Sequence, residues 1–438
     1  MQIVQREQKY GPSRNHDGQR ALLTIFDATP RPMEIQDVNQ SELKLRKSMS
    51  WKRVLIPVIL GVAAATWILI HNLNSHSYIE AKPGDLGARY EWIDFNQNGI
   101  ADRTLDSDFS FSASGTYIRR TSIELLSNVH WDVYASIALM LALAMMVIRD
   151  LGYMYRIRIL TDKQLSWKQS FEVIMLWEFA SAMTPSIVGG SGIAMFILNR
   201  EGINFGKSTA ITFVTAMLDE IFYIVTVPIV LIAVGTDSLF PESWAGDTFG
   251  TNSVKVLFWI GYLFIVLLTL LITLSIFLFP GLFKRILQRI TSLSFLKRFR
   301  KRATEIGNEI ILTSTELRGK PFSYWARSFG ATLVSWAARF MTLNFILLIF
   351  SPNFFRSDLF NHLEVVGRQL VMWVIMLISP TPGGSGIAEL ALAKFFDYLM
   401  PAGLLALVAI LWRLMTYFPY LFVGAFILPR FLRRTASN

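Results

Sequence analysis

The chain has 438 residues, of which 53% are hydrophobic and 17% are charged, and its formal net charge is +10. The hydrophobic residues form long runs, a composition that is typical of a membrane protein and excludes a soluble enzyme. The absence of cysteine excludes disulfides, thiolate metal sites and cysteine nucleophiles.

Residues 1–50 are polar with scattered charges and are expected to form a cytoplasmic tail. A first transmembrane helix is predicted within residues 51–73, because about 20 apolar residues are enough to cross a bilayer. Basic residues precede this helix, so the positive-inside rule places the N-terminus in the cytoplasm. Residues 74–130 are richer in acids than in bases and are expected to form an extracytoplasmic insertion.

Part of the insertion has the spacing of a calcium-binding loop. The expected ligands are Asp94, Asn96, Asn98, Ile100 through its backbone, and Asp102. The twelfth position of the loop is Leu105, where a bidentate glutamate is usual. A solvated Asn-Gly turn is the alternative interpretation. No histidines are paired at metal-ligand spacing, so zinc is not expected.

The main membrane domain is predicted over residues 131–434. Unpaired backbone groups are costly in lipid, so apolar runs of this length must be helical. The fold class is therefore an all-α polytopic membrane protein. A basic segment at 281–320 is expected in the cytoplasm, and a repeat boundary is expected near 240–253. The full spans are predicted at about residues 133–148, 208–234, 254–279, 324–350 and 403–428.

Two further apolar segments, residues 171–198 and 365–400, are interrupted by proline and glycine. If each leaves the membrane on the side where it entered, the basic connections and both termini all lie in the cytoplasm. We therefore predict two re-entrant hairpins in addition to six spans. The alternative, with eight crossings, would leave basic residues outside.

The hexapeptide GGSGIA occurs twice, at residues 189–194 and 383–388, and prolines precede both copies. Asp219 lies 30 positions after Gly189, and Arg413 lies 30 positions after Gly383. The chain is thus predicted to contain two homologous halves, each with about three spans and one hairpin, that enter the membrane from opposite sides. Such inverted repeats are typical of transporters, which hold substrate near the midplane between broken helices.

The proline- and glycine-rich turns of the two hairpins are expected to bind substrate. Turns of this kind leave backbone amides free to face an anionic group. The alternative is that the glycines only allow close helix packing. The predicted residues are Thr184, Pro185, Gly189, Gly190, Ser191 and Gly192 in the first copy, and Pro382, Gly383, Gly384, Ser385 and Gly386 in the second.

Charged residues inside the predicted spans extend this site. A charge at the bilayer centre costs about 2.5–3.5 kcal/mol on insertion scales, so it is expected to face protein or water. Arg413 is expected to contact a phosphate through its planar fork. An ion pair that only locks helices together is the alternative for each of these residues. The charged residues added to the predicted cavity are Glu178, Asp219, Glu220, Glu389 and Arg413, and Arg339 also lies near mid-span.

Two expectations concern where individual charges lie. Asp219 and Arg413 occupy equivalent places in the two halves, so they are expected to lie near one another across the axis that relates the halves. Arg149 and Arg368 are close to membrane ends, so their side chains are expected to extend to the interface.

The segment SPTPGGSGIAE at residues 379–389 resembles the signature of the flippase-like transmembrane domain of lysylphosphatidylglycerol synthases. The resemblance covers roughly residues 131–434 and includes Arg149-Asp150, Glu178, Asp219-Glu220 and Arg413. It implies membrane lipid translocation, or handling of lipid-linked precursors, in the bacterial inner membrane. The soluble aminoacyl-transfer domain of full synthases does not follow, so lipid aminoacylation is not expected.

The predicted function is that of an inner-membrane lipid transporter that moves a phospholipid or lipid-linked precursor head group through a midplane cleft. The expected partners are anionic or zwitterionic membrane lipids, together with a second copy of the chain or an envelope enzyme, and not nucleic acid. The alternative is a membrane scaffold or accessory subunit of a lipid-modifying enzyme. An intramembrane enzyme is not expected, because the sequence contains no HExxH, GxSxG or cysteine nucleophile.

Overall fold

The structure is a computed structural model of the chain. The predicted tail, the first transmembrane helix and most of the predicted repeat boundary lie outside the residues that it describes. The described residues are 76–81, 84–95, 106–127, 129, 131–184, 186–240, 251–293, 300–377, 381, 384, 386–400 and 402–435.

The insertion contains a four-stranded antiparallel sheet, which was not predicted from the sequence. Its spatial order is β1-β4-β2-β3. Tyr78 and Phe109 stack at 4.1 Å between ring centroids and are buried on one face of the sheet. Aromatic pairs of this kind stabilise a small sheet that has few other buried residues. The strands are β1 (His76–Glu80), β2 (Arg89–Trp92), β3 (Phe109–Phe111) and β4 (Tyr117–Thr121), and α4 (Ser122–Ser127) follows.

The predicted all-α membrane domain is confirmed. The structure has five helical stretches that are long and apolar enough to span a bilayer, and they correspond to the five predicted spans that fall within the described residues. α9 continues through a π-helical turn at Leu274–Leu278, and the last stretch bends at Tyr417. The stretches are α5 (Val133–Leu160), α8 (Phe205–Val234), α9 (Thr251–Thr273), α12 (Phe322–Phe350), and α16 (Ala402–Thr416) with α17 (Phe418–Thr435).

The first interrupted segment forms a helical hairpin of α6 (Trp167–Met183) and α7 (Ser186–Arg200). Thr184 is extended, with φ −106° and ψ 139°. A residue that precedes proline avoids the helical region, so α6 ends here. The open ends of the hairpin meet, because Gln169 Nε2 donates to Glu201 Oε2 at 2.8 Å.

The second interrupted segment also reverses direction. After the short helix α13 (Pro352–Ser357), the chain runs through α14 (Leu359–Met376) and returns through α15 (Ile387–Phe395). Gly384 and Gly386 have φ of 69° and 84°, in the left-handed region that glycine adopts without steric cost. These glycines allow the backbone to turn directly into α15.

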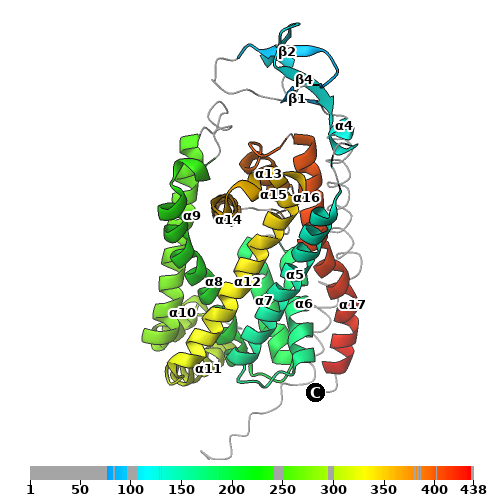
Figure 1. The fold of residues 1–438 in the computed structure, drawn as a ribbon. Coiled ribbons are helices and arrows are strands. Elements are labelled where there is room, and N and C mark those ends of the chain that lie inside the picture. The colour runs from blue at the N-terminus through cyan, green and yellow to red at the C-terminus, as the bar shows by residue number, and fades with distance from the viewer. Residues whose placement is uncertain are drawn as a thin grey trace, which may run out of the picture. The chain divides into compact units, whose positions relative to one another are not determined.

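α5 and α12 pack closely against each other in antiparallel orientation (Figure 1). Ala135 and Ala138, near the start of α5, cluster with Ile349, near the end of α12. Further along, Gly152 lies against Ser335, and a Cβ at this glycine would collide with the serine hydroxyl. Each hairpin follows the C-terminal end of one of these helices, so the two hairpins begin at opposite ends of the pair.

The two GGSGIA copies are 194 residues apart, and the helices of the two halves correspond at this offset to within a few residues. At this offset α5 corresponds to α12, α6 to α14, α7 to α15, and α8 to α16 with α17. The helix order is therefore the same in the two halves, and the corresponding helices α5 and α12 run antiparallel.

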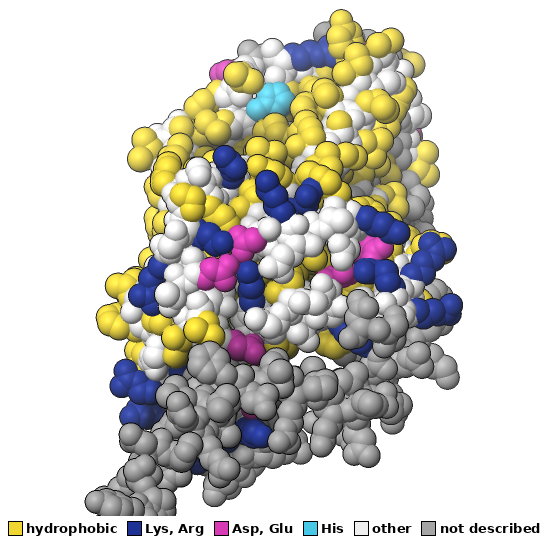
Figure 2. Space-filling view, turned by 90° about the horizontal axis from the view of Figure 1, so that it is seen from below, with side chains coloured by type: hydrophobic (Ala, Val, Ile, Leu, Met, Phe, Trp, Pro, Cys, Tyr) yellow, Lys and Arg dark blue, Asp and Glu magenta, His cyan; other side chains and the backbone are white. Residues whose placement is uncertain are grey.

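The basic segment contains α10 (Pro280–Ile290) and α11 (Arg300–Arg318), which pack together. Figure 2 views this end of the molecule and shows Lys and Arg side chains interspersed with acidic ones. Asp162 accepts hydrogen bonds from Lys207 at 3.0 Å and Lys320 at 2.6 Å. Burial raises the pKa of Asp162, but these hydrogen bonds outweigh burial and hold the pKa below its usual value.

Candidate functional site

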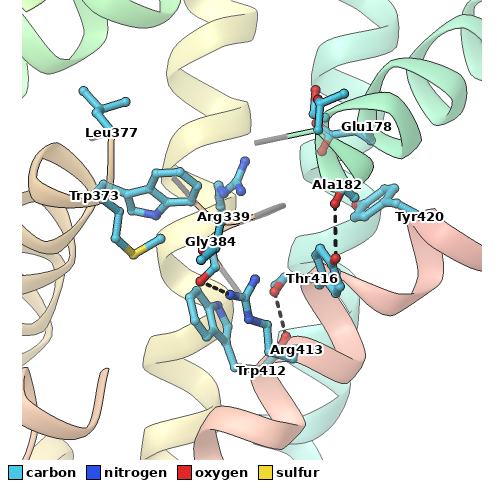
Figure 3. Close-up of a pocket in the computed structure, with 15 residues that line it drawn as sticks. Glu178, Ala182, Arg339, Trp373, Leu377, Gly384, Trp412, Arg413, Thr416 and Tyr420 are labelled. Atoms are coloured by element: carbon cyan, nitrogen blue, oxygen red, sulfur yellow. Dashed lines mark hydrogen bonds between the residues drawn. The ribbon is translucent and has the colours of Figure 1, made fainter. Parts of the chain in front are cut away.

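A cavity of about 190 Å³ lies where the tips of the two hairpins approach α12, α16 and α17 (Figure 3). It brings together residues from both halves of the chain. Its lining residues are Glu178, Ser181, Ala182, Thr184, Arg339, Trp373, Met376, Leu377, Thr381, Gly384, Trp412, Arg413, Thr416, Tyr417 and Tyr420.

On the side of the first hairpin, Glu178 is held by Arg149 of α5. The guanidinium of Arg149 is paired with Glu178 at 2.5 Å and with Asp150 at 2.9 Å, and it also donates to the Tyr420 hydroxyl. Tyr420 in turn donates to Asp150 at 2.9 Å. Arg149 is 1% exposed, so the expectation that it extends to the interface is wrong. Two nearby carboxylates keep this buried arginine in the protein interior.

On the side of the second hairpin, Arg413 of α16 fixes the turn. Its Nε donates to Glu389 Oε1 at 2.7 Å, and its Nη2 donates to the Gly384 carbonyl at 3.1 Å. The other oxygen of Glu389 accepts the backbone N–H of Gly386 at 2.7 Å. Arg413 thus connects α16 with the backbone around Gly384 and with the first helical turn of α15. Its Nε and Nη2 atoms both donate to protein groups.

Asp219 and Arg413 form ion pairs with different residues and not with each other. The Asp219 carboxylate is paired with Arg156 of α5 at 2.5 Å and accepts the indole N–H of Trp336 at 2.9 Å. Glu220 faces a different helix, where it accepts a hydrogen bond from Thr269 of α9 at 2.7 Å. Neither acid is among the residues that line the cavity. Asp219 instead connects α8 with α5 and α12, and Glu220 connects α8 with α9.

The first GGSG copy is helical and does not form a turn. Gly189, Gly190, Ser191 and Gly192 lie within α7, which begins directly after Pro185. Gly190 is packed so closely against Ser181 that a Cβ would collide with the serine side chain. This is the close helix packing that was the alternative interpretation for the glycines. The hairpin tip is instead formed around Thr184, which lines the cavity.

Of the predicted site residues, Glu178, Thr184, Gly384 and Arg413 line the cavity, and Glu389 contacts it through Arg413. Gly386 donates its backbone N–H to Glu389 and so supports the same wall. Predicted residues outside the part of the chain that the structure describes are Pro185, Pro382, Gly383 and Ser385.

Arg339 is not among the binding residues predicted from the sequence, although it lies near the middle of a predicted span. It lines the cavity, with its guanidinium 4.3 Å from the ring centroid of Trp373 and 5.2 Å from that of Trp336. Within the described residues it forms no ion pair or hydrogen bond. Its position in the middle of an apolar span is the signal that could have identified it.

Arg368 also differs from expectation. It is 8% exposed, donates to the Phe395 carbonyl at 2.8 Å and pairs with Glu364 at 3.3 Å. It therefore joins the two arms of the second hairpin and does not extend to the interface.

The predicted calcium loop is largely outside the described residues. Asp94 is described and has φ 43°, in the left-handed region, but Asn96, Asn98, Ile100 and Asp102 are not described. Among the residues that are described, no group of three or more His, Cys, Asp or Glu side chains could hold a metal ion. The calcium site stays a prediction.

The helical membrane fold and the cavity between two hairpin tips define a polytopic membrane protein whose cavity is lined by charged, aromatic and aliphatic side chains. A family profile described as the lysylphosphatidylglycerol synthase TM region matches residues 114–424, more than two thirds of the chain. The chain therefore belongs to this family, as its resemblance implied. Membership places it among membrane proteins involved in lipid handling.

A relative in the archaeon Archaeoglobus fulgidus, described as a UPF0104 membrane protein, is 25% identical to the chain over 266 residues. The aligned part covers 60% of this chain and 76% of the relative. No solved structure matches the chain.

Proposed function

We propose that this protein is a lipid transporter whose cavity receives the head group of a phospholipid or lipid-linked precursor and passes it between the membrane leaflets. The observation that carries the proposal is the cavity itself, which is formed jointly by the tips of two hairpins from the two halves of the chain. Transporters with inverted repeats bind substrate where their broken helices meet.

The cavity lining supports a polar head group. It contains both charged and aromatic side chains, including Glu178, Arg339 and Arg413. Charges of both signs suit an anionic or zwitterionic head group. Its volume of about 190 Å³ is below the ~300–1,000 Å³ of pockets that enclose drug-sized ligands. The acyl chains would therefore remain in the surrounding lipid while the head group moves.

The proposed orientation places both termini in the cytoplasm and the protein in the inner membrane of a bacterium. The basic α10–α11 end would then face the cytoplasm, as the positive-inside rule requires. The two hairpins would enter from opposite faces, with α6–α7 from the cytoplasm. The lipid leaves the protein chemically unchanged, so no catalytic role is assigned to any residue.

A scrambling assay tests the proposal. Purified protein is reconstituted into vesicles that carry fluorescent phosphatidylglycerol or phosphatidylethanolamine, and a membrane-impermeant reductant bleaches the label in the outer leaflet. A transporter makes the inner-leaflet label accessible, whereas a scaffold leaves about half of the label protected. Protein-free vesicles prepared in parallel give the background rate.

The competing proposal is a scaffold or accessory subunit of an envelope enzyme, in which the hairpins serve only for packing. The close fit of Gly190 against Ser181 favours a packing role for that glycine but does not account for the charged side chains that line the cavity. Protein that is folded, reconstituted and unable to move any of the lipids tested would favour the scaffold.

A further inference from the structure

We propose that Arg339 is the residue that binds the phosphate of the transported lipid. The inference rests on the proposed function, and it assigns to Arg339 the role that the sequence suggested for Arg413. It also limits the substrates to lipids whose head group carries a phosphate.

The first argument is the contrast between Arg339 and the other arginines near the cavity. Arg149, Arg156 and Arg413 each have a carboxylate oxygen within 2.5–2.7 Å. Within the described residues, Arg339 has no carboxylate partner and no hydrogen bond. An arginine at mid-span is costly unless it meets a counter-charge or water. A bound phosphate would supply a counter-charge in direct contact with Arg339.

The second argument is the way in which the guanidinium is held. Trp336 and Trp373 lie edge to face, with ring centroids 5.7 Å apart, and both are within cation–π distance of Arg339. A cation–π contact is not a hydrogen bond, so the guanidinium N–H groups keep their capacity to donate. Those N–H groups match two phosphate oxygens in a bidentate arrangement.

The third argument is that the aromatic support is itself fixed. The indole N–H of Trp336 donates to Asp219 at 2.9 Å, and Arg156 holds that carboxylate at 2.5 Å. Phe222 stacks on Trp336 with 5.6 Å between ring centroids. Asp219 is therefore a positioning residue, which acts on the head-group site through Trp336. This chain of contacts pre-organises Arg339 before a lipid arrives.

Glu178 also lines the cavity and would repel an anion if its charge were free. Its carboxylate is paired with Arg149 at 2.5 Å, although Arg149 divides its charge between Glu178 and Asp150, which is 2.9 Å away. Arg413 and Glu389 form a one-to-one ion pair. Among the charged side chains that line the described cavity, Arg339 is the one that makes no direct ion pair.

The test compares Arg339→Gln, Arg339→Lys and the control Arg430→Gln. Arg430 is exposed on α17, and its guanidinium lies 4.2 Å from the ring centroid of Phe426. It therefore makes a cation–π contact but does not line the cavity. Each variant is assayed for binding of phosphatidylglycerol in detergent by native mass spectrometry and for scrambling in vesicles. A glycosyl diacylglycerol, which lacks phosphate, is the comparison lipid, and inorganic phosphate is added as a competitor.

The glutamine variant is expected to bind phosphatidylglycerol at least about tenfold more weakly, because a charge-assisted hydrogen-bonded contact is lost. The lysine variant should be intermediate, since it keeps the charge but loses the planar fork. The control should bind as the wild type does. Competition by inorganic phosphate would show that the phosphate group alone is recognised. A lack of competition would show that the lipid's glycerol and acyl chains contribute to binding.

Equal binding by wild type and both Arg339 variants, with unchanged melting temperatures, would overturn the inference even if scrambling is observed. Preference of the wild type for the phosphate-free glycolipid would overturn it as well. If binding depends on Arg339 but no lipid is scrambled, the inference stands and the transport proposal fails. If the glutamine variant does not fold, the lysine variant decides by the same binding measurement.

Discussion

Arg413 and Glu389 form an ion pair at 2.7 Å that joins α16 to the first turn of α15 at the wall of the cavity. Both side chains are largely buried, and each makes a second contact with the hairpin backbone, to Gly384 and Gly386 respectively. The pair therefore fixes the shape of the second hairpin tip, and its loss should be felt first as a loss of stability.

Replacement of Arg413 by alanine is expected to destabilise the protein by about 3–5 kcal/mol, because Glu389 would be left buried without its partner. Arg413→Lys should cost less, since it keeps the charge. Thermal unfolding in detergent measures both, and adding Glu389→Gln to Arg413→Ala should restore part of the loss. An alanine variant that melts like the wild type but cannot move lipid would instead indicate that Arg413 contacts the head group directly.

Trp336→Phe tests whether the aromatic support of Arg339 is positioned through Asp219. The substitution keeps a ring on α12 but removes the indole N–H that donates to Asp219. We expect a stability loss of about 0.5–1.5 kcal/mol, because the half-buried carboxylate loses one donor but keeps its bond from Arg156. Lipid binding should weaken together with it. Trp259→Phe is a matched control, because Trp259 is exposed on α9. A lower free energy of unfolding with unchanged lipid affinity would show that the contact between Trp336 and Asp219 is structural only.

The opposite entry of the two hairpins can be tested by cysteine labelling, because the chain contains no cysteine. Lys168, near the start of α6, and Asn353, in α13, are both exposed. With an impermeant maleimide applied to intact cells, Asn353→Cys should react and Lys168→Cys should react only after the membrane is opened. Labelling of both positions from the same side would contradict the inverted arrangement.

The Asp162 cluster should make stability depend on pH. Its carboxyl has a pKa that is lowered in the folded protein, so its contribution is present above the pKa of the unfolded chain and is lost as pH falls through the folded value. At pH 7 we expect Asp162→Asn to cost about 1 kcal/mol, as for a partly exposed pair. Melting curves of the two proteins should converge in acid, whereas Asp237→Asn, at an exposed site, should follow the wild type throughout.

Calcium binding by the insertion remains testable on the intact protein. If the loop that starts at Asp94 binds calcium, the ion at ten times its Kd should stabilise the protein by about 1.4 kcal/mol. Asp94→Ala should abolish the shift in melting temperature, and magnesium should not reproduce it. Melting temperatures that calcium leaves unchanged in both proteins would identify the segment as a solvated turn.

Several features followed from the sequence because they depend on local composition. The spans are set by the length of apolar runs, and the breaks at Thr184 and around Gly384 follow from proline and glycine, whose backbone preferences do not depend on tertiary contacts. The repeated GGSGIA predicts two related halves, and the helices on either side of its two copies occur in the same order. The sheet of the insertion was missed because its short strands lack a clear alternating pattern.

The tertiary structure decided which charges meet. Asp219 and Arg413 occupy equivalent sequence positions, yet they pair with Arg156 and Glu389 because those partners are brought close by helix packing. The same holds for Arg149, which appeared to lie at a membrane end but is buried between Glu178 and Asp150. Sequence marks a charge within a span as costly, but only the packed helices determine whether that charge is balanced by protein or left to meet a ligand.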